Sequence, residues 1–130
     1  MTPRILVVDD EPAMLRSVER VLAHDYKVAA IRIPREALDI AGTFNPHLAI
    51  LDIQMPDMDG FELMDKLQAL DPELDVILMT GSIYELDAKL IRAIRKKAFY
   101  FLQKPFDKKM LLAAIQVALG RTPDASADSP

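Results

Sequence analysis

Ile5-Leu6-Val7-Val8-Asp9-Asp10 is a short apolar run closed by two adjacent acids, and it indicates the fold class more clearly than any other segment of the chain. Three further runs of this kind also end in a polar side chain. They are Leu48–Asp52, which ends in an acid, Val76–Thr80, which ends in a hydroxyl, and Phe99–Lys104, which ends in an ammonium. Apolar runs of this length, separated by helical patterns, are typical of buried parallel strands. The sequence therefore predicts a parallel sheet whose strands end in polar residues.

Strand and helix patterns alternate five times along the chain, which predicts a doubly wound, three-layer α/β sheet with right-handed crossovers. The expected strands are Ile5–Val8, Tyr26–Ile31, His47–Leu51, Asp75–Thr80 and Phe99–Gln103. The expected helices begin at Pro12, at Pro34 (ending near Gly42), before Leu63 (ending at Asp71-Pro72), at Ile83 (ending near Lys97) and at the N-cap Asp107, with Gly120 in the C′ position.

The polar strand ends predict a single site. In an open parallel sheet, ligands bind beyond the carboxyl ends of the strands. Asp9, Asp10, Asp52, Thr80 and Lys104 are therefore expected to gather at one edge. Crowded carboxylates repel one another unless a hard cation joins them, and oxygen ligands of this kind suit Mg²⁺. The pattern indicates a site that holds a divalent ion and handles a phosphoryl group.

Composition narrows the class of protein. The chain has 130 residues, of which 51% are apolar, so one domain with a real core is expected. It has no cysteine, no apolar run long enough to span a bilayer, and no signal-peptide pattern, which together predict a cytoplasmic protein. Its formal net charge of −4 disfavours direct binding to nucleic acid or to a membrane.

Four motifs, in order, resemble the receiver (phosphoacceptor) domain of bacterial two-component response regulators. They are Asp9-Asp10, Leu51-Asp52 with Met55-Pro56-Asp57-Met58-Asp59-Gly60 after it, Met79-Thr80-Gly81, and Lys104-Pro105-Phe106. The resemblance implies a flavodoxin-like (βα)5 sandwich with a five-stranded parallel sheet in the order 2-1-3-4-5. It assigns residues 1–120 to the receiver domain. Residues 121–130 then read as a flexible tail or the start of a linker.

The resemblance also implies roles for the acidic residues. Asp52 would be the nucleophile that takes a phosphoryl group from a phosphohistidine. Asp9, Asp10 and Asp52, with the backbone carbonyl of Gln54, would hold Mg²⁺. In this family the second acid of the pair usually touches the metal and the first acts through water, which here would be Asp10 and Asp9 respectively.

The remaining roles concern the phosphoryl group and the switch. Lys104 would pair with a phosphoryl oxygen, and before that with Asp52; its bond to Pro105 resembles the family's cis peptide. Thr80 would donate a hydrogen bond to the phosphoryl group and move toward it. Phe101 stands where the family carries a switch aromatic that would fill the space left by Thr80.

The implied function is signal relay rather than enzymatic turnover. A sensor histidine kinase or a phosphotransfer protein would donate the phosphoryl group, and an output domain or effector protein would respond. The output face would comprise the helix from Ile83, the strand at Phe101 and the last helix. A homodimer formed on activation is compatible with this interpretation.

Two other hypotheses remain open at this point. The first is a Mg²⁺-dependent aspartate phosphohydrolase of the haloacid dehalogenase type, which carries two acids two residues apart after its first strand; here these would be Asp9 and Glu11. The second is a receiver that serves only as a docking module, although none of the five site residues is missing.

Overall fold

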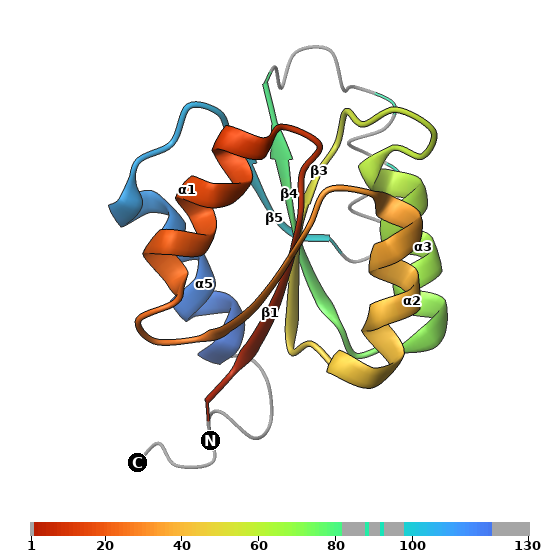
Figure 1. Cartoon of the computed structure of the whole chain (residues 1–130), viewed down its shortest axis with the longest axis horizontal. Helices are drawn as coiled ribbons and strands as arrows, with labels where there is room; N and C mark the ends of the chain where they lie inside the picture. The colour runs from red at the N-terminus through yellow and green to blue at the C-terminus, as the bar shows by residue number, and fades with distance from the viewer. Residues whose placement is uncertain (1, 82–87, 89–91, 93–97, 121–130) are drawn as a thin grey trace.

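The computed structural model describes residues 2–81, 88, 92 and 98–120. The expected helix from Ile83 and the tail from Arg121 lie outside the described residues. The strands, labelled as in Figure 1, are β1 (Arg4–Val8), β2 (Lys27–Ile31), β3 (Leu48–Asp52), β4 (Asp75–Thr80) and β5 (Ala98–Gln103). The described helices are α1 (Pro12–Leu22), α2 (Pro34–Phe44), α3 (Gly60–Leu70) and α5 (Lys108–Gly120). None of these helices is long and apolar enough to cross a membrane.

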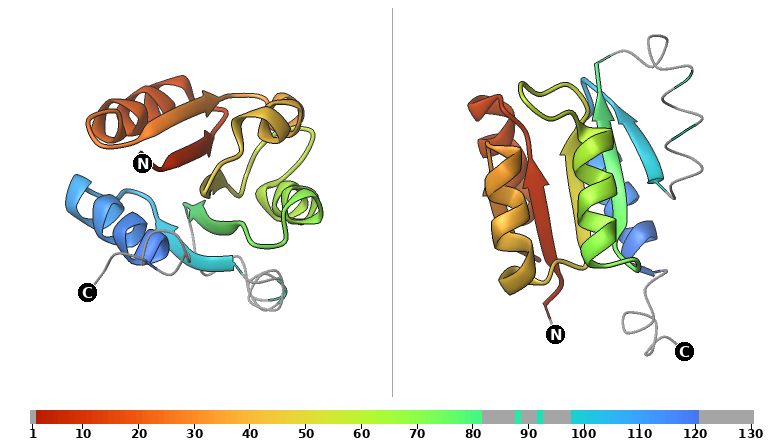
Figure 2. Two further views of the ribbon diagram at one scale, coloured as in Figure 1. Left: turned by 90° about the horizontal axis from the view of Figure 1, so that it is seen from below. Right: turned by 90° about the vertical axis from the view of Figure 1, so that its right-hand side faces the viewer.

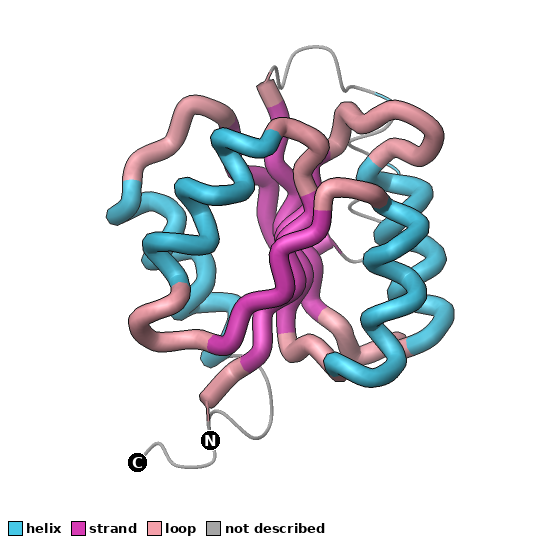
Figure 3. Tube along the Cα trace, viewed as in Figure 1, coloured by secondary structure: helices cyan, strands magenta, loops and turns pink. Residues whose placement is uncertain are grey.

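The strands form one sheet in the order β2-β1-β3-β4-β5, and every neighbouring pair is parallel. The predicted fold class and strand order are therefore confirmed. Helices α1 and α5 cover one face of the sheet, and α2 and α3 cover the other (Figure 1). The right-hand view of Figure 2 shows the same layers, with α2 and α3 in front of the sheet and α5 behind it. All five strands run the same way, so their carboxyl ends meet at the upper edge in Figure 3.

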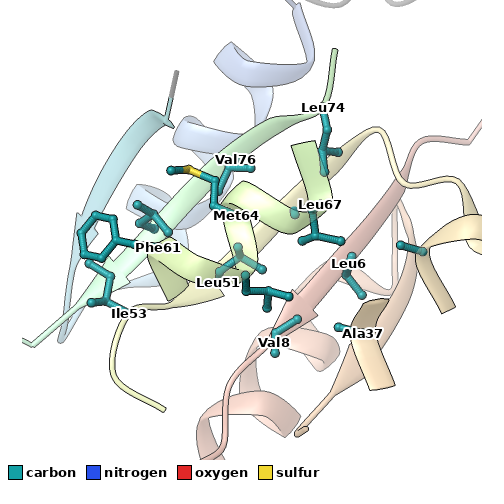
Figure 4. Packing of buried hydrophobic residues seen from close by; sticks show 14 of the residues in the cluster. Leu6, Val8, Ala37, Leu51, Ile53, Phe61, Met64, Leu67, Leu74 and Val76 are labelled. Carbon is teal, nitrogen blue, oxygen red and sulfur yellow. The ribbon is translucent and has the colours of Figure 1, made fainter. Parts of the chain in front are cut away.

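Alternation along the strands builds two separate cores. Side chains of successive strand residues point to opposite faces, so in β1 Leu6 and Val8 join the core under α2 and α3, while Ile5 and Val7 join the core under α1 and α5. Figure 4 shows the first core, where Phe61 and Leu67 of α3 pack onto the sheet. The central strands are buried on both faces, which explains why their sequences are continuous apolar runs rather than alternating ones.

The predicted end of α2 and the predicted role of Gly120 differ from the structure, whereas the predicted N-cap of α5 agrees with it. Helix α2 continues past Gly42 to Phe44, where Asn45 adopts a left-handed conformation with φ 52° and closes the helix. Asparagine tolerates that conformation better than most residues. The prediction that Gly120 is the C′ residue is wrong, because α5 includes it and none of the described glycines has a positive φ. The Asp107 N-cap is confirmed, since the Met110 N–H donates to Asp107 Oδ1 at 2.8 Å.

Gly60 sits where α3 begins against the end of β3. Its N–H donates to the carbonyl oxygen of Ile53 at 2.9 Å. A Cβ atom at this position would lie 2.5 Å from the backbone oxygen of Asp52 and 2.9 Å from the Cα atom of Ile53. Neither backbone atom can give way without moving the carboxyl end of β3, so the close approach requires glycine.

We predict that Gly60→Ala destabilises the protein by about 1 to 3 kcal/mol, because the added methyl group overpacks against backbone. Gly42→Ala is the matched control: no atom lies within 4 Å of its added Cβ in α2. That change should stabilise by about 0.5 to 1 kcal/mol, since alanine favours a helix. Urea unfolding of both variants checks the pair, and a Gly60→Ala protein as stable as the parent would contradict the account.

Candidate functional site

The carboxyl edge of the sheet brings the predicted polar residues together. Asp52 is the last residue of β3 and Thr80 the last of β4, while Asp9 and Lys104 directly follow β1 and β5. The strand register aligns these ends, because Val8 is opposite Leu51, Asp52 opposite Met79, and Thr80 opposite Gln103. The site is therefore a product of the parallel topology.

Three carboxylates crowd at this edge. One oxygen from each of Asp9, Asp10 and Asp52 lies within 4.8 Å of the others. Asp9 is fully buried and Asp52 is only 6% exposed, whereas Asp10 faces solvent. An all-oxygen set with one exposed member fits Mg²⁺, which binds a few carboxylates and keeps several waters. The donor set thus suits the ion that the sequence predicts.

Lys104 supplies the positive charge inside the cluster. Its Nζ atom lies 3.1 Å from Asp9 Oδ2 and 3.5 Å from Asp52 Oδ1. Its backbone N–H donates to the carbonyl oxygen of Thr80 at 2.7 Å, which ties it to the end of β4. The peptide bond between Lys104 and Pro105 is cis, as the resemblance implied.

Both oxygens of Asp9 already have protein partners. The Glu11 N–H donates to Oδ1 at 2.9 Å, and Lys104 donates to Oδ2 at 3.1 Å. The Asp9 backbone N–H donates to the carbonyl oxygen of Ile31 at 3.2 Å. Two hydrogen bonds therefore hold the Asp9 side chain and a third holds its backbone, while Asp10 beside it remains exposed and available to a ligand.

Backbone N–H groups of the loop after β3 contact β4 and the Asp52 carboxylate. The Ile53 N–H donates to the carbonyl oxygen of Met79 at 3.0 Å, so the loop continues the pairing with β4. The Gln54 N–H makes a long contact of 3.4 Å to Asp52 Oδ1. Gln54 is exposed and its N–H faces the site residue. The resemblance named Gln54 for its backbone carbonyl, and that role stays a prediction. The sequence analysis missed the close approach of Gly60, whose only signal was a glycine at the end of a turn.

Thr80 and Phe101 lie where they were expected. Thr80 is 3% exposed at the carboxyl end of β4. Phe101 is half-buried on β5, opposite Leu78, and packs against the core under α2 and α3. The predicted movements of Thr80 and Phe101 stay predictions.

Burial and crowding change the proton affinity of the site. The pKa of Asp52 is raised to about 6, mainly by burial and also by the nearby negative charge of Asp9, although Lys104 and the Gln54 N–H act in the opposite direction. Burial lowers the pKa of Lys104, but the charges of Asp52 and Asp9 outweigh it, so the net pKa is raised and the ammonium stays charged. Three carboxylates against one ammonium leave an excess of negative charge that a divalent cation would relieve.

We predict that Asp52→Asn stabilises the metal-free protein at neutral pH. Folding raises the pKa of Asp52 from 3.8 to about 6, so the folded state binds the proton more tightly than the unfolded chain. Stability then falls as the pH rises from about 4 to about 6 and stays lower above that range. Asparagine removes this penalty, a gain of about 1 to 3 kcal/mol at neutral pH that disappears below pH of about 4.

Chemical unfolding at several pH values, with a chelator present, measures the difference between the two proteins. Asp39→Asn, at an exposed position of α2, is the control and should change stability by less than about 0.5 kcal/mol. If the Asp52→Asn protein were less stable than the parent at neutral pH, the charge of Asp52 would stabilise the folded state, and the prediction would be wrong.

Comparison with known proteins places this arrangement in a family. Residues 5–116 match the response regulator receiver domain. The response regulator MprA of Mycobacterium sp. strain KMS is 34% identical over 132 aligned residues, covering 100% of this chain and 56% of MprA. MprA of Mycolicibacterium vanbaalenii is 34% identical over 129 residues, covering 98% of this chain and 55% of that protein. The chain thus spans about half the length of the curated relatives it matches.

Solved structures of response regulators have the same fold as this chain. A CheY-like response regulator receiver domain protein from Methanospirillum hungatei JF-1 superposes with a TM-score of 0.86 at 29% identity, covering 99% of this chain and 100% of that one. The response regulator DrrB, an OmpR/PhoB homologue from Thermotoga maritima, gives a TM-score of 0.81 at 29% identity, covering 93% of this chain and 54% of DrrB. Members of the family accept a phosphoryl group, bind Mg²⁺ at an acidic pocket and relay a signal. The chain belongs to the response regulator receiver domains of two-component systems.

Proposed function

We propose that Asp52 is the phosphoacceptor of this chain and that its donor is a sensor histidine kinase or a phosphotransfer protein. One observation carries the proposal. The buried carboxylate of Asp52 lies within 4.8 Å of two other carboxylates and 3.5 Å from the ammonium of Lys104, at the open edge of the sheet. A nucleophile, a charge-compensating cation and room for a divalent ion occur together there.

The transfer step follows from these positions. One Asp52 oxygen forms a bond to phosphorus while the bond from phosphorus to the donor's imidazole nitrogen breaks, and the imidazole leaves with the electron pair. Asp52 must be ionised to attack, and a pKa of about 6 leaves it mostly ionised at neutral pH. Lys104 is placed to pair with a phosphoryl oxygen, and the Thr80 hydroxyl to donate to another. Catalysis of this kind depends mainly on positioning and charge.

The metal would be held by Asp9, Asp10, Asp52 and the carbonyl oxygen of Gln54. Because both Asp9 oxygens already accept hydrogen bonds, Asp10 and Asp52 are the direct ligands in this proposal, and Asp9 acts through water. When bound, Mg²⁺ neutralises part of the negative charge that Asp52 and the incoming phosphoryl group bring together.

The phosphoryl group then biases a conformational equilibrium. Moving a population from mostly inactive to mostly active takes several kcal/mol of differential stabilisation. A dianionic group paired with Lys104 and Thr80 supplies charge-assisted hydrogen bonds of that total strength. Thr80 moves toward the group, and Phe101 turns into the space that it leaves.

The chain is a switch rather than an enzyme with a free substrate, and we place it in the cytoplasm, where kinases draw on ATP. Residues 1–120 form the receiver, and residues 121–130 a tail or the start of a linker. An output domain or effector protein receives the signal, and activated chains pair as homodimers. The receiver itself binds no nucleic acid, in keeping with its net charge of −4.

Two other functions are less well supported. A haloacid dehalogenase-type phosphohydrolase would use Asp9 as its nucleophile, yet both Asp9 oxygens have partners and the family match points elsewhere. A docking module without phosphorylation would not need the acidic cluster and Lys104 to be intact.

We predict one phosphoryl adduct when the chain is incubated with Mg²⁺ and acetyl phosphate, measured by intact mass. The adduct should disappear with a chelator, because the crowded carboxylates need the divalent cation to admit a further anion. Asp52→Asn should abolish it.

Asp9→Asn separates the two nucleophile hypotheses. This substitution removes one carboxylate from the proposed Mg²⁺ site, so the adduct should form more slowly. It keeps Asp52, the proposed acceptor, so the adduct should still appear. If Asp9→Asn abolished the adduct while Asp52→Asn retained it, the dehalogenase-type mechanism would be favoured. An unmodified chain that gains no mass would favour the docking module.

A further inference from the structure

A second hollow opens beside the acidic cluster on the side away from Lys104. Its volume is about 240 Å³, and it is lined by Asp10, Arg32, Ile33, Pro34, Pro56 and Asp57. Asp10 belongs both to this hollow and to the carboxylate cluster, so the hollow adjoins the site at that residue. The proposed chemistry at Asp52 uses none of the other five lining residues.

Pairing of the first two strands fixes the position of Arg32. Val8 is opposite Ile31, and the Asp9 N–H donates to the carbonyl oxygen of Ile31 at 3.2 Å. Arg32 is the next residue, so it leaves the sheet beside Asp9 and Asp10. Its side chain is exposed and makes no hydrogen bond or ion pair within the described ranges. An unengaged guanidinium offers a fork of donors that matches a carboxylate.

The opposite wall of the hollow is a tight turn after β3. The Met58 N–H donates to the carbonyl oxygen of Pro56 at 2.8 Å, and Asp57 at the apex has φ 71°. A residue other than glycine in this left-handed region is strained, and such strain persists only where the surrounding structure enforces it. The fold therefore holds Pro56 and Asp57 in place opposite Arg32 without help from a ligand.

The chemistry of the lining suggests what the hollow accepts. Ile33 is 43% exposed and, with the two prolines, gives an apolar wall. Arg32 is the single cation of the lining, which also includes the carboxylates of Asp10 and Asp57. A small group with an apolar end and a carboxylate fits this combination, provided that its carboxylate lies against Arg32.

We propose that this hollow is the leaving-group subsite for acyl phosphate donors and that Arg32 is a specificity-determining residue which binds the departing carboxylate. The inference rests on the proposed function. An Asp52 oxygen forms a bond to phosphorus, the bond from phosphorus to the acyl oxygen breaks, and the carboxylate leaves with the electron pair. No proton has to be supplied, because a simple carboxylic acid is ionised at neutral pH. The negative charge that develops on the acyl oxygen is stabilised by the guanidinium.

Two phosphodonors that carry the same phosphoryl group test this assignment. Acetyl phosphate releases acetate, whereas phosphoramidate releases uncharged ammonia, which gains nothing from a guanidinium. Initial rates of adduct formation with Mg²⁺ present should be measured by intact mass for the parent chain, Arg32→Gln and Arg35→Gln. Arg35→Gln is the matched control, since it removes the same charge from an exposed position three residues away that does not line the hollow.

We expect Arg32→Gln to react about five- to tenfold more slowly with acetyl phosphate, a loss within the usual net range of one hydrogen bond, as suits an exposed side chain. Its rate with phosphoramidate should stay within about twofold of the parent rate, since that reaction lacks the bond. Arg35→Gln should resemble the parent with both donors. Arg32→Lys, which keeps the charge but loses the fork, should recover part of the acetyl phosphate rate.

Other outcomes would overturn the assignment. An equal loss with both donors would mean that Arg32 acts on the phosphoryl group or through the general field of the site. An unchanged acetyl phosphate rate in Arg32→Gln would mean that the guanidinium does not contact the leaving group. A parent chain that accepts a phosphoryl group from neither donor would contradict the proposed function itself, and the subsite with it.

Discussion

Three carboxylates crowd around one ammonium at the carboxyl edge of the sheet, and this electrostatic constraint explains the rest of the site. Asp9, Asp10 and Asp52 approach within 4.8 Å of one another, and Lys104 reaches two of them, at 3.1 Å and 3.5 Å. Such a cluster is electrostatically unfavourable without a further cation. The rest of the fold must therefore hold the groups together, and a divalent cation would relieve the resulting excess of negative charge.

Backbone contacts hold these groups together. The parallel register aligns the ends of β1, β3 and β4, and the close approach of Gly60 fixes the turn after Asp52. The N–H of Lys104 is bonded to the carbonyl oxygen of Thr80, so the cation and the hydroxyl of the site move together with the ends of two neighbouring strands.

Much of this arrangement could be predicted from the sequence, because topology alone carries strand ends to a common edge. The runs at Ile5–Val8 and Leu48–Leu51 were sufficient for the parallel sheet, and the strand order and the roles of single residues came from resemblance. Features set by tertiary contacts were not predictable. The need for Gly60 depends on how α3 meets β3, and the helical conformation of Gly120 could not be predicted from its residue type. Arg32 follows a strand as Lys104 does, so the same rule would have identified it.

Locating the phosphoryl group in the chain would decide whether Asp52 is the phosphoacceptor. Sodium borohydride reduces an acyl phosphate to an alcohol, so an aspartyl phosphate becomes homoserine, which survives digestion and peptide sequencing by mass spectrometry. We predict homoserine at position 52 alone, and only after incubation with both Mg²⁺ and the phosphodonor. Homoserine at Asp9 or Asp10, or an adduct that borohydride leaves intact, would contradict it.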